Sequence, residues 1–241
     1  DADIYEERKA LGKLICPRVL QAIDYDIKNT VISYIPNTAS VAFQGMAEAF
    51  ADYANEQKIK AILENKDRLD ETVLRDIFTL APRREYIAVK DVKLRTFITK
   101  DSERDDMVAH VYDVTYGQVR EYVDNLVVID DSIVRGTTLK QSIVRILDRL
   151  GPKKIVIAFN AAIALLKESG QEHIIEEVYR KSKAQENLPK EEIVNYVKEI
   201  YAPFTDEQIS AKITELVTPD NINAEIEIVF NTIESLHKAC P

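Results

Sequence analysis

Short apolar runs alternate along this chain with longer segments in which apolar residues recur at helical spacing. Four of the runs have the length and the β-branched content of buried strands. They are residues 31–35, 86–89, 126–130 and 154–157. Two segments between the first and second runs predict helices, as does the N-terminal segment. They are residues 1–26, 41–54 and 58–80. This alternation predicts an α/β fold with a central, mostly parallel sheet flanked by helices.

Beyond the fourth run the pattern becomes mainly helical. Residues 158–162 already look helical, so the strand would pass into a helix without a turn, which suggests that residues are missing between Ile157 and Ala158. Thr205 and Gln208 have the spacing of a capping box at a helix start. Residues 224–230 fit a strand or a helix. We therefore expect a main domain over residues 1–160 and a mainly helical C-terminal extension over 161–241, packed on it.

The most informative stretch is residues 126–139. An apolar strand ends at two carboxylates, Asp130 and Asp131, and a short turn containing Gly136 follows. Apolar residues then recur at helical spacing until Gly151 and Pro152 end the helix. In open parallel sheets, ligands bind beyond the carboxyl ends of the strands. The stretch therefore predicts a binding site at a strand tip.

The residue types in this stretch suit a sugar phosphate. The unpaired N–H groups of a helix start suit a phosphate, and Gly136 allows close approach while Thr137 and Thr138 add hydroxyl donors. The paired carboxylates suit vicinal sugar hydroxyls or a magnesium ion beside that phosphate. In the alternative, both aspartates are turn residues and Thr137 is an N-cap. For a lone Asp-Asp pair we would prefer that alternative, but the whole string favours the site.

The string Val-Ile-Asp-Asp-Ser-Ile-Val-Arg-Gly-Thr-Thr, residues 128–138, resembles the phosphoribosyl-pyrophosphate (PRPP) loop of type I phosphoribosyltransferases. The residues of this string are most similar to those of the amidophosphoribosyltransferase family, which commits PRPP to purine synthesis. The resemblance covers roughly residues 4–157 and implies the type I phosphoribosyltransferase fold. It also implies a set of PRPP-binding residues. They are Asp130, Asp131, Ser132, Val134, Arg135, Gly136, Thr137 and Thr138.

The resemblance extends to the loop at residues 36–40. In the family this loop contacts pyrophosphate and helps to hold magnesium, which implies such contacts for Asn37, Thr38 and Ser40. Asp130, Asp131 and Thr38 are the implied metal ligands. The family usually carries an acidic residue after the proline, whereas this chain has Asn37, so only hydroxyl groups remain here for a metal contact. A role for Thr38 or Ser40 as the N-cap of the following helix fits equally well.

A second loop of the family closes over PRPP and supplies cations to its pyrophosphate. The string Arg-Thr-Phe-Ile at residues 95–98 matches the start of that loop. The resemblance implies catalytic roles for Arg95 and Lys93, because cations stabilise the charge that develops on the leaving pyrophosphate. The family has an arginine-rich stretch further on, and this chain has a weaker cation set there. A surface charge is the alternative for any single lysine, and His110 between apolar residues is more typical of a structural histidine.

The implied reaction is displacement of pyrophosphate from C1 of PRPP by ammonia, with magnesium as cofactor. Residues 4–12 resemble the entry to the transferase half of the family, where an N-terminal glutaminase domain precedes it and releases ammonia from glutamine. We therefore expect this chain to be the C-terminal part of a longer protein. Two alternatives stay open: a type I phosphoribosyltransferase that acts on a nucleobase, and a non-catalytic PRPP-binding regulator.

Composition narrows the class of partner. A formal net charge of −9 over 241 residues argues against nucleic acid, which requires a basic face. The sequence holds no apolar run of membrane-spanning length, so we expect no membrane partner. Two cysteines, Cys16 and Cys240, form no disulfide framework in a chain of this length, which favours a reducing cytoplasm. We also expect a homo-oligomer.

Overall fold

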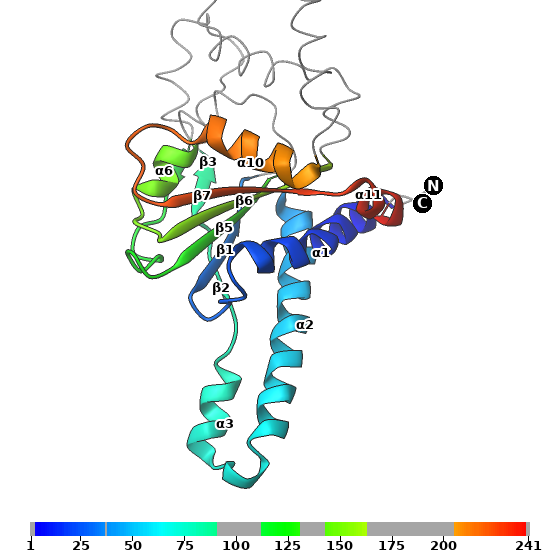
Figure 1. Cartoon of the computed structure of the whole chain (residues 1–241), viewed down its shortest axis with the longest axis vertical. Helices are drawn as coiled ribbons and strands as arrows, with labels where there is room; N and C mark the ends of the chain where they lie inside the picture. The colour runs from blue at the N-terminus through cyan, green and yellow to red at the C-terminus, as the bar shows by residue number, and fades with distance from the viewer. Residues whose placement is uncertain (1–2, 37, 91–111, 131–142, 163–204, 240–241) are drawn as a thin grey trace, which may run out of the picture.

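A computed structural model of the protein describes residues 3–36, 38–90, 112–130, 143–162 and 205–239. In that part of the chain, five parallel strands form a sheet in the order β2-β1-β5-β6-β7 (Figure 1). They are β1 (Thr30–Tyr34), β2 (Arg83–Arg84), β5 (Asn125–Asp130), β6 (Lys154–Ala162) and β7 (Glu225–Asn231). A separate antiparallel pair consists of β3 (Ala88–Lys90) and β4 (Tyr112–Val114). The predicted α/β class is confirmed.

Helices cover both faces of the sheet (Figure 1). One face carries α1 (Ile4–Ala22) and the first half of α2 (Ser40–Glu64), and the other carries α6 (Val144–Asp148) and α10 (Asp206–Val217). Three further helical segments are η1 (Lys66–Arg68), α3 (Glu71–Phe78) and α11 (Ile233–Ala239). No helix in the described ranges is long and apolar enough to span a membrane.

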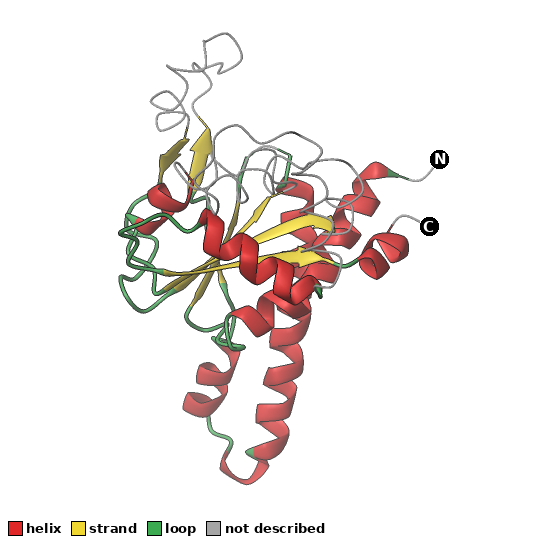
Figure 2. Ribbon diagram, turned by 45° about the horizontal axis from the view of Figure 1, so that its top comes forward, coloured by secondary structure: helices red, strands yellow, loops and turns green. Residues whose placement is uncertain are grey.

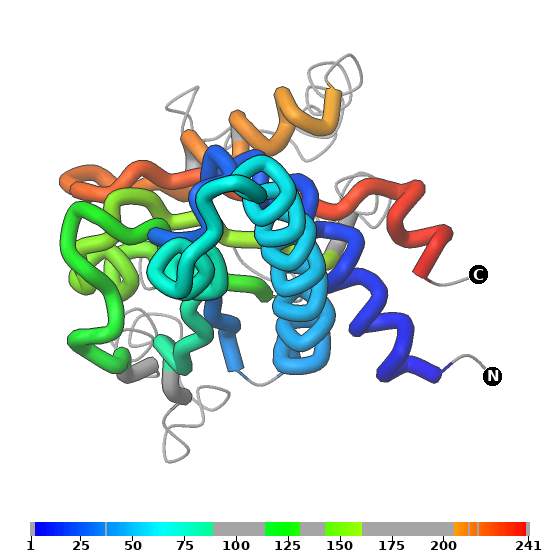
Figure 3. Tube along the Cα trace, turned by 90° about the horizontal axis from the view of Figure 1, so that it is seen from below, coloured from blue at the N-terminus to red at the C-terminus, as the bar shows by residue number. Residues whose placement is uncertain are grey.

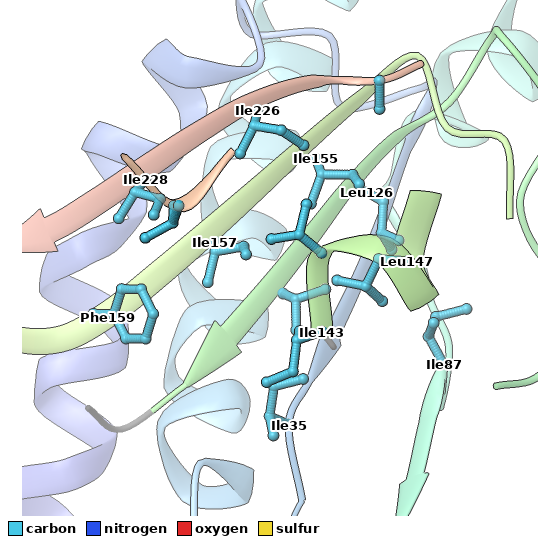
Figure 4. Packing of buried hydrophobic residues seen from close by; sticks show 14 of the residues in the cluster. Ile35, Ile87, Leu126, Ile143, Leu147, Ile155, Ile157, Phe159, Ile226 and Ile228 are labelled. Atoms are coloured by element: carbon cyan, nitrogen blue, oxygen red, sulfur yellow. The ribbon is translucent and has the colours of Figure 1, made fainter. Parts of the chain in front are cut away.

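The near-continuous apolar sequence of β5 reflects burial on both faces. Leu126 and Val128 pack in the core on the α6 and α10 side (Figure 4), whereas Val127 and Ile129 pack in the core under α1 and α2. All four side chains are at most 1% exposed. Each such burial stabilises the fold by about 1.5–3 kcal/mol relative to exposure. A strand with this pattern fits only the middle of a sheet covered on both faces.

Helices α1 and α2 cross at very close range (Figure 3). A Cβ added at Gly12 would lie 1.9 Å from the carbonyl oxygen of Ala42, and one added at Gly45 would lie 1.9 Å from that of Lys9. Each glycine therefore gives up helix propensity so that the two backbones can touch. This contact fixes α2, and with it the loop that precedes α2, against the sheet.

Two buried residues at the amino ends of the strands, Asp124 and Lys154, form ion pairs with more exposed partners. The Asp124 side chain is 0% exposed directly before β5 and accepts hydrogen bonds from the guanidinium groups of Arg83 and Arg120. Burial works against ionisation of Asp124, but the hydrogen bonds from Arg120 and Arg83 outweigh it, and the pKa of this carboxyl is lowered. Lys154, at the start of β6, pairs with Glu225 and Glu227 of β7. These ion pairs help to hold neighbouring strands in register at their amino ends.

The third strand expected at residues 86–89 is right only in part, because residues 88–90 form β3, which lies outside the central sheet. Glu85 still donates its N–H to Ile32 of β1 at 3.1 Å, but the N–H of Ile87 bonds the Ser33 hydroxyl at 3.1 Å instead of a strand carbonyl. The chain therefore leaves β1 at Ile87 and continues into β3. The place beside β1 in the sheet belongs to β2.

The expected helix at residues 158–162 is also wrong, since β6 continues to Ala162, so the reason for expecting missing residues after Ile157 no longer holds. The choice left open for residues 224–230 is a strand, because residues 225–231 form β7, the edge strand of the central sheet. The capping box is confirmed: Thr205 and Gln208 bond one another reciprocally at the start of α10. Whether residues 161–241 form a distinct extension stays a prediction.

Replacing Asp124 with Asn should lower the free energy of unfolding by about 2–3 kcal/mol at pH 7, because charge-assisted hydrogen bonds from two arginines are lost. The lowered pKa means that this contribution is present above the unfolded pKa of Asp and is lost as pH falls through the folded value. Urea unfolding from pH 7 to pH 3 measures both effects. A Glu121→Gln control on the same loop should change little. A constant difference between Asp124→Asn and the wild type across that range would contradict this role.

Alanine normally stabilises a helix relative to glycine by about 1 kcal/mol. At the crossing of α1 and α2 we expect the opposite sign. Gly12→Ala should lower the free energy of unfolding by about 1–3 kcal/mol, because the new methyl group must separate two backbones. Urea unfolding measures this, with Glu56→Ala at an exposed position of α2 as the control. A Gly12→Ala protein as stable as the wild type would disprove the close contact.

Candidate functional site at the carboxyl edge of the sheet

The carboxyl ends of β1 and β5 lie side by side and their chains then part. Tyr34 pairs with Ile129, and Ile35 donates its N–H to the Ile129 carbonyl at 3.0 Å. After β1 the chain turns to α2 on one face of the sheet. After β5 it leads to α6 on the other face (Figure 1). Such a divergence is the topological switch point at which open parallel sheets bind ligands.

Asp130 is the last residue of β5 and lies at this switch point. It pairs in register with Phe159 of β6 and is partly buried. Because side chains alternate along a strand, it falls on the same face as Leu126 and Val128. This confirms the predicted place of the first carboxylate at a strand tip. The rest of the predicted PRPP loop lies outside the described residues, namely Asp131, Ser132, Val134, Arg135, Gly136, Thr137 and Thr138.

The loop between β1 and α2 brings two hydroxyls to the same edge. Thr38 is exposed and Ser40 is the first residue of α2. The N-cap of α2 is Ala39, and no side chain in the described structure caps this helix. The capping alternative for Thr38 and Ser40 is therefore wrong, which leaves both hydroxyls for another use. Asn37 lies outside the described residues.

The expected cation-bearing loop starts and ends on the β3–β4 pair. Ile87, just before β3, accepts a hydrogen bond from the N–H of Thr115, just after β4, at 3.0 Å. The N–H of Ile87 also bonds the Ser33 hydroxyl of β1, so the base of this short antiparallel pair, which stands apart from the central sheet in Figure 2, is fixed close to the end of β1. Lys93 and Arg95 lie between β3 and β4 but outside the described residues. Their roles stay predictions.

An aromatic cluster that sequence reasoning missed borders the loop at residues 36–40. The Tyr34 ring lies 5.1 Å from the Phe43 ring and 5.8 Å edge-on from the Tyr86 ring, measured between centroids. Burial, with a smaller effect of Tyr86, raises the pKa of Tyr34, so it stays a neutral phenol. Tyr86 is 70% exposed. Tyr86 lies far from Tyr34 and Phe43 in the sequence, and no local pattern predicts that these rings are in contact.

The possible metal ligands among the described residues at the carboxyl ends of β1 and β5 are oxygen atoms. No group of three or more His, Cys, Asp or Glu side chains that could hold a metal occurs within the ranges the structure describes. Magnesium, however, needs only one or two carboxylates when substrate phosphates and water complete its octahedron. The Asp130 carboxylate and the Thr38 hydroxyl are oxygen donors of the kind that magnesium prefers.

Comparison with known proteins supports the fold through structure alone. No family model matches the sequence, and no curated protein matches it. A solved structure of the allosteric regulatory enzyme of purine biosynthesis superposes with a TM-score of 0.51 at 20% identity, over 98% of this chain and 37% of that one. Glutamine PRPP amidotransferase from B. subtilis, complexed with ADP and GMP, superposes with a TM-score of 0.51 at 18% identity.

The second match covers 98% of this chain and 38% of the B. subtilis chain, so this chain spans well under half the length of either enzyme. At these identities the likeness shows the fold: an all-parallel sheet flanked by helices, as in the matching part of both enzymes. The fold implied by the sequence resemblance is thereby confirmed.

Because Ala39 is the N-cap of α2, Thr38→Ala and Ser40→Ala should each change the free energy of unfolding by less than about 0.5 kcal/mol. Thr205→Ala is the matched control, since Thr205 does cap α10 and should cost about 1 kcal/mol. Thermal and urea unfolding of the three variants measure this. A loss in Ser40→Ala as large as that in Thr205→Ala would restore the capping interpretation.

Proposed function

We propose that this chain is the phosphoribosyltransferase part of an amidophosphoribosyltransferase, which transfers ammonia to C1 of PRPP and releases pyrophosphate. The product is 5-phosphoribosylamine, the first intermediate specific to purine nucleotide synthesis. The observation that carries the proposal is the pairing of β1 with β5. It sets Ile35, which precedes the loop at 36–40, beside Ile129, which precedes Asp130, at the switch point of the sheet.

Each part of PRPP has a proposed partner at this edge. Asp130 and Asp131 accept hydrogen bonds from the ribose hydroxyls, since ionised carboxylates are strong acceptors. Residues 134–138 surround the 5-phosphate with backbone N–H groups and the hydroxyls of Thr137 and Thr138. Thr38 and Ser40, whose hydroxyls do not cap α2, face the pyrophosphate with Asn37. Magnesium, when bound beside Asp130 and Thr38, supplies positive charge to the pyrophosphate oxygens.

The proposed step needs charge stabilisation more than proton transfer. A new bond forms between the ammonia nitrogen and C1 while the C1–oxygen bond breaks, and its electron pair leaves with pyrophosphate. C1 becomes positively charged and the leaving group gains negative charge, which Arg95 and Lys93 stabilise. The nitrogen then loses one proton to water. This chemistry fits a site whose described residues offer carboxylate, hydroxyl and aromatic groups.

Glutamine as the source of ammonia belongs to the same proposal. One of the two matching enzymes is a glutamine PRPP amidotransferase, and this chain spans 38% of it. We propose that a glutaminase unit supplies ammonia to this domain in the whole protein.

One observation favours a nucleobase as a second candidate acceptor. Tyr86 is 70% exposed and contacts Tyr34 at the rim of the loop that we assign to pyrophosphate. An exposed aromatic ring at such a place can stack on a heteroaromatic base. Pyrophosphate release that depends on adenine, guanine, hypoxanthine or uracil, and not on ammonium, would favour this candidate.

The ribose contact is tested by Asp130→Asn and Asp131→Asn, with Asp220→Asn at an exposed position as the control. Loss of a charge-assisted hydrogen bond costs about 1.5–3 kcal/mol, so PRPP affinity should fall roughly tenfold to a hundredfold in both variants. Isothermal titration of PRPP in the presence of magnesium measures this. Unchanged affinity in both variants would refute the assigned contact, whatever the reaction.

A further inference from the structure

Two buried asparagines at the carboxyl ends of β6 and β7 carry side-chain oxygens that the fold leaves unpaired. Asn160 is 7% exposed and Asn231 is 1% exposed. In the described part of the chain, neither Oδ1 atom accepts a hydrogen bond. A buried acceptor without a donor costs free energy, and folded proteins keep few of them. Two such acceptors in adjoining residues therefore point to a ligand that supplies the donors.

The orientation of the Asn231 amide is fixed by its partners. Its nitrogen Nδ2 donates to the carbonyl oxygen of Leu11 in α1 at 3.2 Å and to that of Asn160 at 3.3 Å. Exchanging the amide nitrogen and oxygen would set an oxygen against two carbonyl oxygens, so Nδ2 is the atom that faces them and Oδ1 is the atom left over. The same contact joins Asn231 to Asn160, so both unpaired oxygens belong to one buried region.

The strand register places this region at the carboxyl edge of the sheet. Phe159 of β6 pairs with Asp130 of β5, so Asn160 directly follows the residue beside Asp130. The register of β6 against β7 then shifts between Phe159 and Ala162, so Asn160 lies in a bulge of the strand. Bulges re-aim side chains and are frequent beside active sites. The two oxygens therefore lie at the same edge as the candidate PRPP site.

The contact with α1 also links the asparagines to the start of α2. Leu11, which Asn231 bonds, precedes Gly12, and Gly12 lies against the backbone of Ala42 at the close crossing of the two helices. Ala42 is two residues beyond Ser40, the first residue of α2. The asparagines thus adjoin both elements that frame the proposed PRPP site, the end of β5 and the start of α2.

The chemistry of the two oxygens indicates which guest they accept. Amide oxygens accept hydrogen bonds and cannot donate them, so the guest must be small and must supply at least two donors. The oxygens carry no formal charge, and burial disfavours a charge, so a neutral guest fits better than an ion. Ammonia meets these conditions, because two of its N–H groups can pair with the two oxygens while its lone pair stays free to attack.

We propose that Asn160 and Asn231 form a binding site for ammonia, the nucleophile of the proposed reaction. The inference rests on the proposed function, because that reaction is what requires ammonia at this edge. It assigns the two asparagines the role of holding the nucleophile beside the place where Asp130 and its neighbours hold the sugar.

Binding is measured without PRPP, and so apart from the reaction. The full chain is labelled with heavy nitrogen, and the side-chain amide signals of its asparagines are followed by NMR during titration with ammonium chloride. The signals of Asn160 and Asn231 should shift, whereas that of Asn125, a buried asparagine that bonds Thr30 at the amino end of β5, should not. Because ammonia is the bound form, the apparent affinity for total ammonium should rise about tenfold from pH 7 to pH 8. Equal shifts with potassium chloride, an affinity that is the same at both pH values, or no shift at all would overturn the proposal.

A variant tests the same site through the reaction. Asn160→Leu removes one of the two oxygens and nearly keeps the size of the side chain. It should raise the KM for ammonium in pyrophosphate release about fivefold and leave the KM for PRPP within about twofold of the wild type. Because an unpaired buried acceptor disappears, the urea midpoint should stay the same or rise. Asn223→Leu, which makes the same change at an exposed position before β7, should leave both KM values unchanged.

These measurements separate the ammonia site from the proposed function. Ammonium-dependent release with the same KM for ammonium in Asn160→Leu and the wild type would overturn the ammonia site and leave the reaction standing. Ammonium-induced shifts of both asparagine signals, together with no pyrophosphate release, would support the site and contradict the reaction.

Discussion

The parallel pairing of β1 with β5 is the constraint on which the rest of the candidate site depends. The pair ends with Tyr34 opposite Ile129 and with the bond from Ile35 N–H to the Ile129 carbonyl. From there one chain turns to α2 and the other leads to α6, on opposite faces of the sheet. A one-residue slip would exchange the buried side chains of β5 between the two cores, each of which is packed around the side chains it holds. The two cores therefore fix the register, and the register places Asp130 beside the loop at 36–40.

The polar groups at the two ends of the strands differ in their partners. The amino edge holds Asp124 with Arg83 and Arg120, and Lys154 with Glu225 and Glu227, so its charges are paired within the protein. At the carboxyl edge, the hydroxyls of Thr38 and Ser40 leave α2 uncapped, which gives up a contribution that such residues usually make to helix stability. Polar groups that do not serve the fold are the ones expected at a binding site.

The elements that a local sequence pattern determines could be predicted from the sequence. The features that depend on contacts between distant parts of the chain could not. The strands at β1, β5 and β6 follow from apolar runs, and the start of α10 follows from the Thr205 capping box. The two-residue β2 has no pattern of its own and is a strand only because β1 lies beside it. Ile87 leaves the sheet because a side chain, Ser33, takes its N–H. Likewise, the contact of Tyr34 with Tyr86 arises from the fold.

We propose that the carboxyl ends of β1 and β5 bind PRPP for attack by ammonia. Pyrophosphate release from PRPP with magnesium tests it most directly, in three parallel reactions with no addition, with ammonium and with glutamine. We predict release that depends on ammonium. Added glutamine should give no more than the background rate unless a glutaminase unit accompanies the chain. PRPP binding without release under any of the three conditions would contradict the enzyme and favour a PRPP-sensing regulator.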